Sequence, residues 1–118
     1  MSDKWIEYVR PRGRFTYTAP VVILCNHWSA SMAEGFPMGM RALCGAKIVG
    51  TKMMGLGAAV YGSTKAGLDF QYSAEPVYDI FGISRDDVVP DIVLNDADDY
   101  IAKAISVLEN WKTGIKSN

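Results

Sequence analysis

The chain has 118 residues, the length of one domain, and its 49% of hydrophobic residues argues against intrinsic disorder. The formal net charge of −1 gives no electrostatic reason to expect nucleic acid or an anionic membrane as a partner. The single histidine and the two cysteines have no metal-ligand spacing, so we expect no structural metal, and we expect no cofactor.

No stretch is long and apolar enough to span a bilayer, and the N-terminus lacks the apolar core of a signal peptide. The sequence therefore leaves the compartment open, including export of a longer parent protein whose signal lies outside this chain.

The first half of the chain predicts a strand, a helix and a second strand. Residues 1–19 form a lead-in segment whose proline and glycine favour an extended or turning path. The apolar run 20–25 predicts a buried strand, and a helix is expected from about residue 31 to 43, stopped by Gly45. Residues 47–50 predict the next strand. This order favours a right-handed parallel crossover.

Apolar residues at near-helical spacing suggest which side of the first helix is buried. They are Met32, Phe36, Met40 and Leu43. Cys25 lies in the predicted strand and Cys44 near the helix end, and we interpret both as reduced residues in or near the core.

The second half predicts a hairpin and a terminal helix. Residues 58–61 and 68–72 could pair around the glycine-bounded segment 62–67, and the alternation in 68–72 is typical of a half-buried strand. A loop is expected over 79–92. A helix is predicted for about 97–112, where apolar residues recur at helical spacing. They are Ile101, Ala104, Ile105, Leu108 and Trp111.

Acidic residues and an asparagine precede that terminal helix. Asn95 or Asp96 can cap its start, and Asp98 and Asp99 would then lie in its first turn.

Two serines follow the first predicted strand closely, in the segment Asn26–Gly35, N-H-W-S-A-S-M-A-E-G. A serine at a strand-to-helix junction is positioned by the backbone, beside the free N–H groups of the helix start. Those groups favour the negative charge that develops on the oxyanion during acyl transfer. Ser29 and Ser31 are therefore candidate functional residues, although a serine at such a place is often a cap or turn residue.

The ordered motifs of the chain resemble the C-terminal-processing peptidases, or tail-specific proteases, and their tricorn-like relatives. Residues 29–34, S-A-S-M-A-E, resemble the S-A-S-A-x-E nucleophile segment of that family. Residues 46–51 match the strand that follows it, and 54–57 take the place of its T-x-G-x-G loop. Residues 82–83 and 89–93 resemble its G-I-x-P-D-I-x-V stretch, with a short insertion.

The resemblance implies an α/β fold of the ClpP/crotonase kind, represented here by a half-domain: a strand–helix–strand core with a hairpin and a C-terminal helix. Residues 1–118 would be a single domain, the C-terminal part of a catalytic domain. Ser31 falls on the nucleophile position, and the backbone N–H of Met32 falls on an oxyanion-donor position. The implied activity is that of a serine peptidase, a hydrolase acting on polypeptides.

The chain departs from the family at the general base. Leu56 stands where dyad enzymes of the family carry a lysine, and leucine cannot accept a proton. The tricorn-like branch uses an upstream histidine and a downstream glutamate instead. This chain holds no histidine far upstream, and Glu75 is a weak candidate for the carboxylate.

Other residues near the serine have weaker functional interpretations. His27, four residues before Ser31, could reach it if the turn folds back, but such a histidine more often orients a loop. Lys52 and Lys65 could replace the missing lysine only if they were desolvated. Glu34 suits a capping-box partner that holds the serine backbone, and Ser29 suits a turn hydroxyl.

Three functional hypotheses remain open. The first is a peptidase domain that needs a base from an upstream segment or a partner chain. The second is a non-catalytic peptide-binding or interaction module of the same fold. The third is a piece of a longer protein whose uncovered sheet edges and apolar surface favour self-association, which predicts a homo-oligomer.

Overall fold

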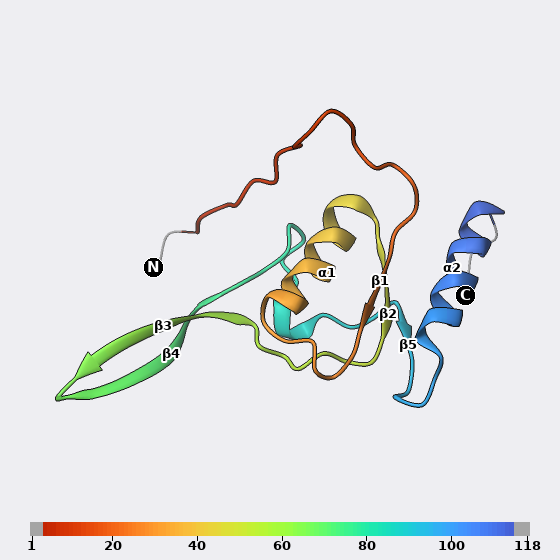
Figure 1. Ribbon diagram of the computed structural model, residues 1–118. Helices are drawn as coiled ribbons and strands as arrows, with labels where there is room; N and C mark the ends of the chain where they lie inside the picture. Colours follow the sequence, from red (N-terminus) through yellow and green to blue (C-terminus); the bar gives the residue numbers. More distant parts are fainter. Residues whose placement is uncertain (1–3, 115–118) are drawn as a thin grey trace.

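The computed structural model describes residues 4–114, which form an α/β fold with a projecting hairpin (Figure 1). Strands β1, β2 and β5 build a parallel sheet in the order β1-β2-β5. Strands β3 and β4 build a separate antiparallel hairpin. The bounds are β1 Val22–Cys25, α1 Met32–Cys44, β2 Lys47–Gly50, β3 Ala58–Lys65, β4 Leu68–Pro76, 3₁₀ helix η1 Arg85–Asp87, β5 Ile92–Val93 and α2 Tyr100–Lys112.

The sheet lies between the two α-helices (Figure 1). Ile48 and Val49 of β2 are both fully buried. Ile48 joins the core cluster that contains Met38 of α1, and its neighbour Val49 faces the opposite side because side chains alternate along a strand. Coverage of both faces explains why the apolar residues Ile48 and Val49 follow each other in β2, and the predicted parallel crossover from β1 through α1 to β2 is confirmed.

Helix α1 has the predicted ends but not the predicted buried face. Gly45 closes it in the left-handed conformation, with φ 69°, and its N–H donates to the carbonyl of Arg41. The expected apolar stripe was wrong, because Met32, Phe36 and Leu43 are all exposed. The buried side chains of α1 are instead Glu34, Pro37 and Met38. Helical spacing missed this face because its key residue is a carboxylate with backbone partners.

The hairpin extends further than predicted and turns more tightly. Residues 62–65 belong to β3, and the turn consists of Ala66 and Gly67, both with positive φ. The alternation in β4 predicted a half-buried strand, which was wrong, since every residue of β4 is exposed. The hairpin projects away from the sheet, and no helix or sheet of the described residues covers β4 (Figure 1).

Helix α2 starts later than expected. Asp99 caps it by accepting a 2.9 Å hydrogen bond from the N–H of Ala102, so the predicted caps Asn95 and Asp96 were wrong. Its buried residues are Ala104 and Val107, whereas Ile101 and Ile105 of the expected stripe are exposed. The sheet covers only part of the apolar side of this helix.

One cysteine and part of the first strand are less buried than predicted. Cys25 is buried, but Cys44 is exposed, so its predicted place in or near the core was wrong; both thiols are free. Residues 4–19 carry no helix or strand and are exposed, as expected of an extended path. Part of β1 is also less buried than predicted, since Leu24 is exposed.

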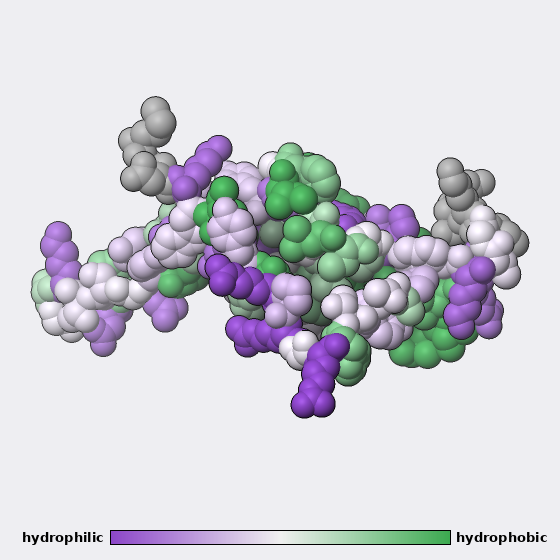
Figure 2. Space-filling view, turned by 90° about the horizontal axis from the view of Figure 1, so that it is seen from above, coloured by the Kyte–Doolittle hydropathy of each residue, from purple (hydrophilic) through white to green (hydrophobic). Residues whose placement is uncertain are grey.

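Hydrophobic side chains remain at the surface. Seen from above, they gather over the middle of the molecule (Figure 2). In the part of the chain that the structure describes, no helix is long and apolar enough to cross a membrane. The same residues contain no group of His, Cys, Asp and Glu side chains that could hold a metal ion.

Candidate active site

A tight turn carries the chain from β1 towards α1. The N–H of Ser29 donates to the carbonyl of Asn26 at 2.9 Å, and the Asn26 side chain accepts from the N–H of Trp28 at 3.0 Å. The Ser29 hydroxyl in turn accepts from the N–H of Asn26 at 3.1 Å. This closed network gives Ser29 the turn role that its position favoured, and it fixes the approach to Ser31.

Ser31 occupies a strained backbone conformation at the start of α1. Its φ is 56° and its ψ is −114°. Among the described residues, only Ala66 of the hairpin turn is another non-glycine residue with positive φ. Such a conformation costs about 1–3 kcal/mol and persists only where the surroundings impose it. A serine on a sharp, strained strand-to-helix turn is how α/β hydrolases present a nucleophile.

Among the described residues, the backbone N–H of Met32 beside Ser31 has no hydrogen-bond acceptor. The N–H groups of Glu34 and Gly35 both donate to the carbonyl of Ser31, at 2.9 Å and 3.0 Å. The N–H of Met32 lies before these bonds, in the turn whose amides have no acceptor within the helix. Its position next to Ser31 at the positive end of α1 suits an oxyanion donor.

The carboxylate of Glu34 fixes the position of Ser31 from inside the protein. Glu34 is only 1% exposed. Its Oε2 accepts from the N–H of Ser31 at 2.7 Å, which is the capping-box bond expected from the sequence. The carboxylate also accepts two bonds from the loop after β2: Oε1 accepts from the N–H of Gly55 at 2.6 Å, and Oε2 accepts from the N–H of Leu56 at 2.9 Å. One buried carboxylate thus joins the serine turn to the Gly-rich loop.

Arg85 holds the same loop through its carbonyl groups. Its Nε and Nη2 donate to the carbonyl of Leu56 at 2.9 Å and 2.6 Å, and Nη2 also donates to that of Ala58 at 2.9 Å. Arg85 is 4% exposed and packs against Gly35 of α1. The sequence placed Arg85 in a predicted loop and assigned it no role. A buried arginine has no periodic pattern, so no sequence signal identified it.

The clamped loop forms one wall of a groove that Ser31 also lines. The groove has a volume of about 330 Å³. Its walls come from the serine turn, the loop after β2, the base of the hairpin and the start of η1. The lining residues are Ser31, Gly55, Leu56, Gly57, Ala58, Val60, Ser73, Pro76, Ser84 and Asp86. Leu56 therefore stands in the groove with Ser31.

The other candidate residues of the sequence lie elsewhere. The Nδ1 atom of His27 is 3.1 Å from Oδ1 of Asp96, and the Glu75 carboxylate accepts from the Tyr61 hydroxyl at 2.6 Å. This bond raises the pKa of Tyr61 above its usual value of 10.0. Lys52 and Lys65 are exposed. None of His27, Glu75, Lys52 and Lys65 lines the groove.

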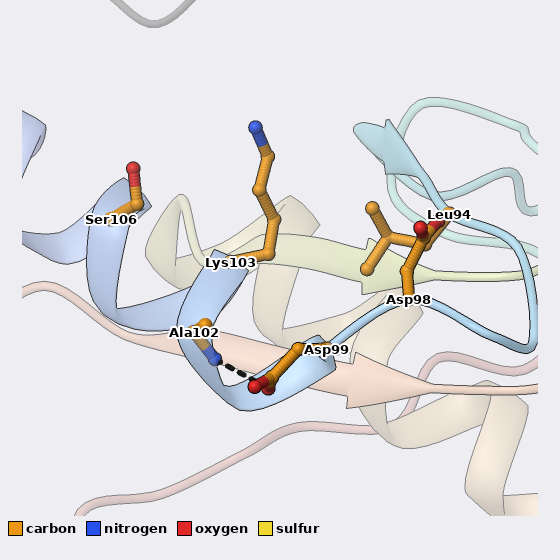
Figure 3. A pocket seen from close by; sticks show the side chains of 6 residues that line it. All are labelled: Leu94, Asp98, Asp99, Ala102, Lys103 and Ser106. Carbon is orange, nitrogen blue, oxygen red and sulfur yellow. Dashed lines mark hydrogen bonds between the residues drawn. The ribbon is translucent and has the colours of Figure 1, made fainter.

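A second hollow lies at the start of α2, away from Ser31. Its volume is about 450 Å³ and it is wide open to solvent. Figure 3 shows Asp99 bonded to the backbone of Ala102, with Lys103 extending outward from the helix. Asp98 likewise accepts from the N–H of Asn95 at 2.6 Å. The carboxylates of this hollow are thus already hydrogen-bonded to the backbone, and the hollow offers no nucleophile beside a free amide.

The fold and the groove define a class: an α/β domain with a strained serine at a helix start, as hydrolases use for acyl transfer. The model of peptidase family S41 matches residues 3–94, and the chain belongs to that family. This family assignment agrees with the resemblance to peptidases seen in the sequence.

A solved structure shares the fold. The crystal structure of mature CPAF superposes with a TM-score of 0.59 at 27% sequence identity, over 86% of this chain. The match spans 21% of the CPAF chain. The comparison with curated proteins gave no match.

Proposed function

We propose that this chain supplies the nucleophile of a serine peptidase of the tail-specific type, with Ser31 attacking the peptide carbonyl. The observation that carries the proposal is the strained backbone of Ser31, at the N-terminus of α1 and on the wall of a groove. In the reaction, Ser31 Oγ bonds to the carbonyl carbon and the amine leaves with a proton. Water then hydrolyses the ester. The N–H of Met32 donates to the oxyanion.

In the mechanisms that the resemblance implies, a histidine or a lysine takes the proton of Ser31. Neither lines the groove, whose one charged side chain is Asp86, and Leu56 cannot accept a proton. We infer that another segment of the complete protein, or a partner copy in a homo-oligomer, supplies the base. Residues 1–118 then form the C-terminal part of the catalytic domain. This arrangement also gives the exposed apolar side of α1 something to pack against.

The test is covalent labelling of the complete protein that contains this chain. A fluorophosphonate probe should add its mass to the peptide that carries Ser31, and Ser31→Ala should abolish both the adduct and peptide hydrolysis. Ser106→Ala is the matched control, because it removes an exposed serine hydroxyl on α2, away from Ser31. Undiminished hydrolysis by Ser31→Ala would overturn the assignment.

A non-catalytic peptide-binding module is the second candidate. The observation in its favour is Leu56, an apolar side chain beside the serine where proton transfer needs a basic group. In that case the complete protein binds polypeptides but resists the probe, and Ser31→Ala leaves binding unchanged.

A further inference from the structure

One charged side chain lines the groove beside Ser31. Asp86 is the middle residue of η1, and the other lining residues are apolar, hydroxyl-bearing or glycine. A groove of about 330 Å³ is at the small end of ligand sites, and its volume suits a single side chain of a peptide. A single carboxylate in such a groove determines the charge of the side chain that binds there.

The protein positions this carboxylate with specific contacts. The Ser84 hydroxyl donates to Oδ1 of Asp86, and the N–H of Arg85 donates to the carbonyl of Val77 at 2.9 Å, which fixes the backbone of η1. Gly57 makes room for the carboxyl group. A Cβ atom at this position would lie 2.7 Å from Cγ of Asp86, a distance that real side chains do not adopt.

No cation of the described residues neutralises Asp86. Arg85 is adjacent, but its guanidinium turns inward and is occupied by the carbonyls of Leu56 and Ala58. Within residues 4–114, the only salt-bridge contact joins His27 and Asp96, and it is an ion pair only when the imidazole is protonated. The next residue, Asp87, adds a second negative charge on the exposed side of η1. The groove thus presents an uncompensated negative charge to whatever binds there.

We propose that the groove binds a lysine or arginine side chain of the polypeptide substrate, with Asp86 as the residue that determines this preference. The aliphatic stem of either side chain packs on Leu56 and Val60, as long cationic side chains do along apolar surface, while the charged end reaches the carboxylate. Because Ser31 lines the same groove, the basic residue lies beside the bond to be cut. This inference rests on the proposed peptidase function.

The test compares two peptides that differ in charge alone. The complete protein with Ser31→Ala is titrated against fluorescein-labelled Ala-Ala-Lys-Ala-Ala and its norleucine counterpart, followed by fluorescence anisotropy. We expect the lysine peptide to bind about fivefold more tightly, the upper range for a solvent-accessible ion pair. Asp86→Asn should remove the difference, and raised salt should reduce it.

Asp87→Asn is the matched control, since it removes the same charge from the same 3₁₀ helix outside the groove and should keep the preference. Gly57→Ala gives a second test, because it displaces the carboxylate without removing it and should also weaken the preference. Equal affinities for the two peptides, no binding of either, or a preference that survives Asp86→Asn would each overturn the inference.

Failure of this inference is distinguishable from failure of the proposed function. Probe labelling of Ser31 with no lysine preference rejects Asp86 as the specificity residue and leaves the nucleophile in place. A lysine preference without labelling supports the binding groove and rejects the nucleophile.

Discussion

Replacement of Glu34 by glutamine tests how the serine turn is held in place. The wild-type carboxylate is buried and accepts three backbone N–H bonds, two at Oε2 and one at Oε1. Glutamine keeps the size of the side chain but has one oxygen, and its NH₂ group can only donate. When the amide oxygen takes the place of Oε2, the NH₂ group faces the N–H of Gly55. Both groups are donors, so no hydrogen bond forms between them.

The expected cost follows from those bonds. A hydrogen bond to a charged group contributes about 1.5–3 kcal/mol, and a neutral one about 0.5–1.5 kcal/mol. One bond is lost and two are weakened, while burying a neutral amide costs less than burying a carboxylate. We expect Glu34→Gln to lower the free energy of unfolding by about 2–3 kcal/mol, a large part of the 5–15 kcal/mol typical of a domain.

Urea denaturation followed by circular dichroism measures this change. With an m value of about 1–3 kcal/mol/M, the midpoint should fall by about 0.7–3 M. Glu109→Gln is the matched control, because this carboxylate is exposed on α2, and its replacement should change stability by less than about 0.5 kcal/mol. If Glu34→Gln were as mild as the control, the three-bond account of the serine turn would be wrong.

Four further predictions concern other parts of the fold. Gly50→Ala should cost more than about 4 kcal/mol, because its Cβ would lie 1.8 Å from the carbonyl oxygen of Cys25. Gly39→Ala should instead stabilise α1 in the same denaturation assay, because nothing lies within 4 Å of its Cβ. Equal effects of the two substitutions would contradict this packing. Iodoacetamide followed by mass spectrometry should modify Cys44 well before Cys25, which is buried. Burial raises the pKa of the Cys25 thiol above 9.0, so its contribution to stability is present below pH 9 and is lost as the pH rises through the raised value, which pH-dependent melting would show. His27→Ala removes an exposed ion pair and should cost less than about 1 kcal/mol while leaving probe labelling within tenfold; loss of labelling would instead make His27 the base.

The strand–helix–strand core was predictable because its signals are local. An apolar run, a helix with a glycine at its end and a second apolar run each depend on a few neighbouring residues. Their order along the chain then favours a parallel crossover, since that connection has a preferred hand. The place of Ser31 just before the helix was predictable for the same reason, whereas its choice over Ser29 came from the resemblance to the peptidase family.

Burial could not be read in the same way. Hydrophobic spacing placed Met32 and Phe36 inside, yet both are exposed, and it gave no sign that Arg85 is buried. Periodicity reports where a helix could be apolar, while the surface that is actually covered depends on which elements pack against it. The hairpin illustrates this, since β4 alternates like a half-buried strand but has no layer beneath it.

The sequence by itself determined the order of the core elements and the place of Ser31 at a helix start, because both follow from contacts between residues close in the chain. Only the tertiary structure decided what surrounds Ser31. Glu34 and Arg85 reach the loop at residues 55–58 from positions 21 and 27 or more residues away, and they shape the groove through backbone atoms that carry no sequence identity. Asp86 enters the groove for the same reason: its place depends on the packing of η1 against Gly57, which no local pattern records.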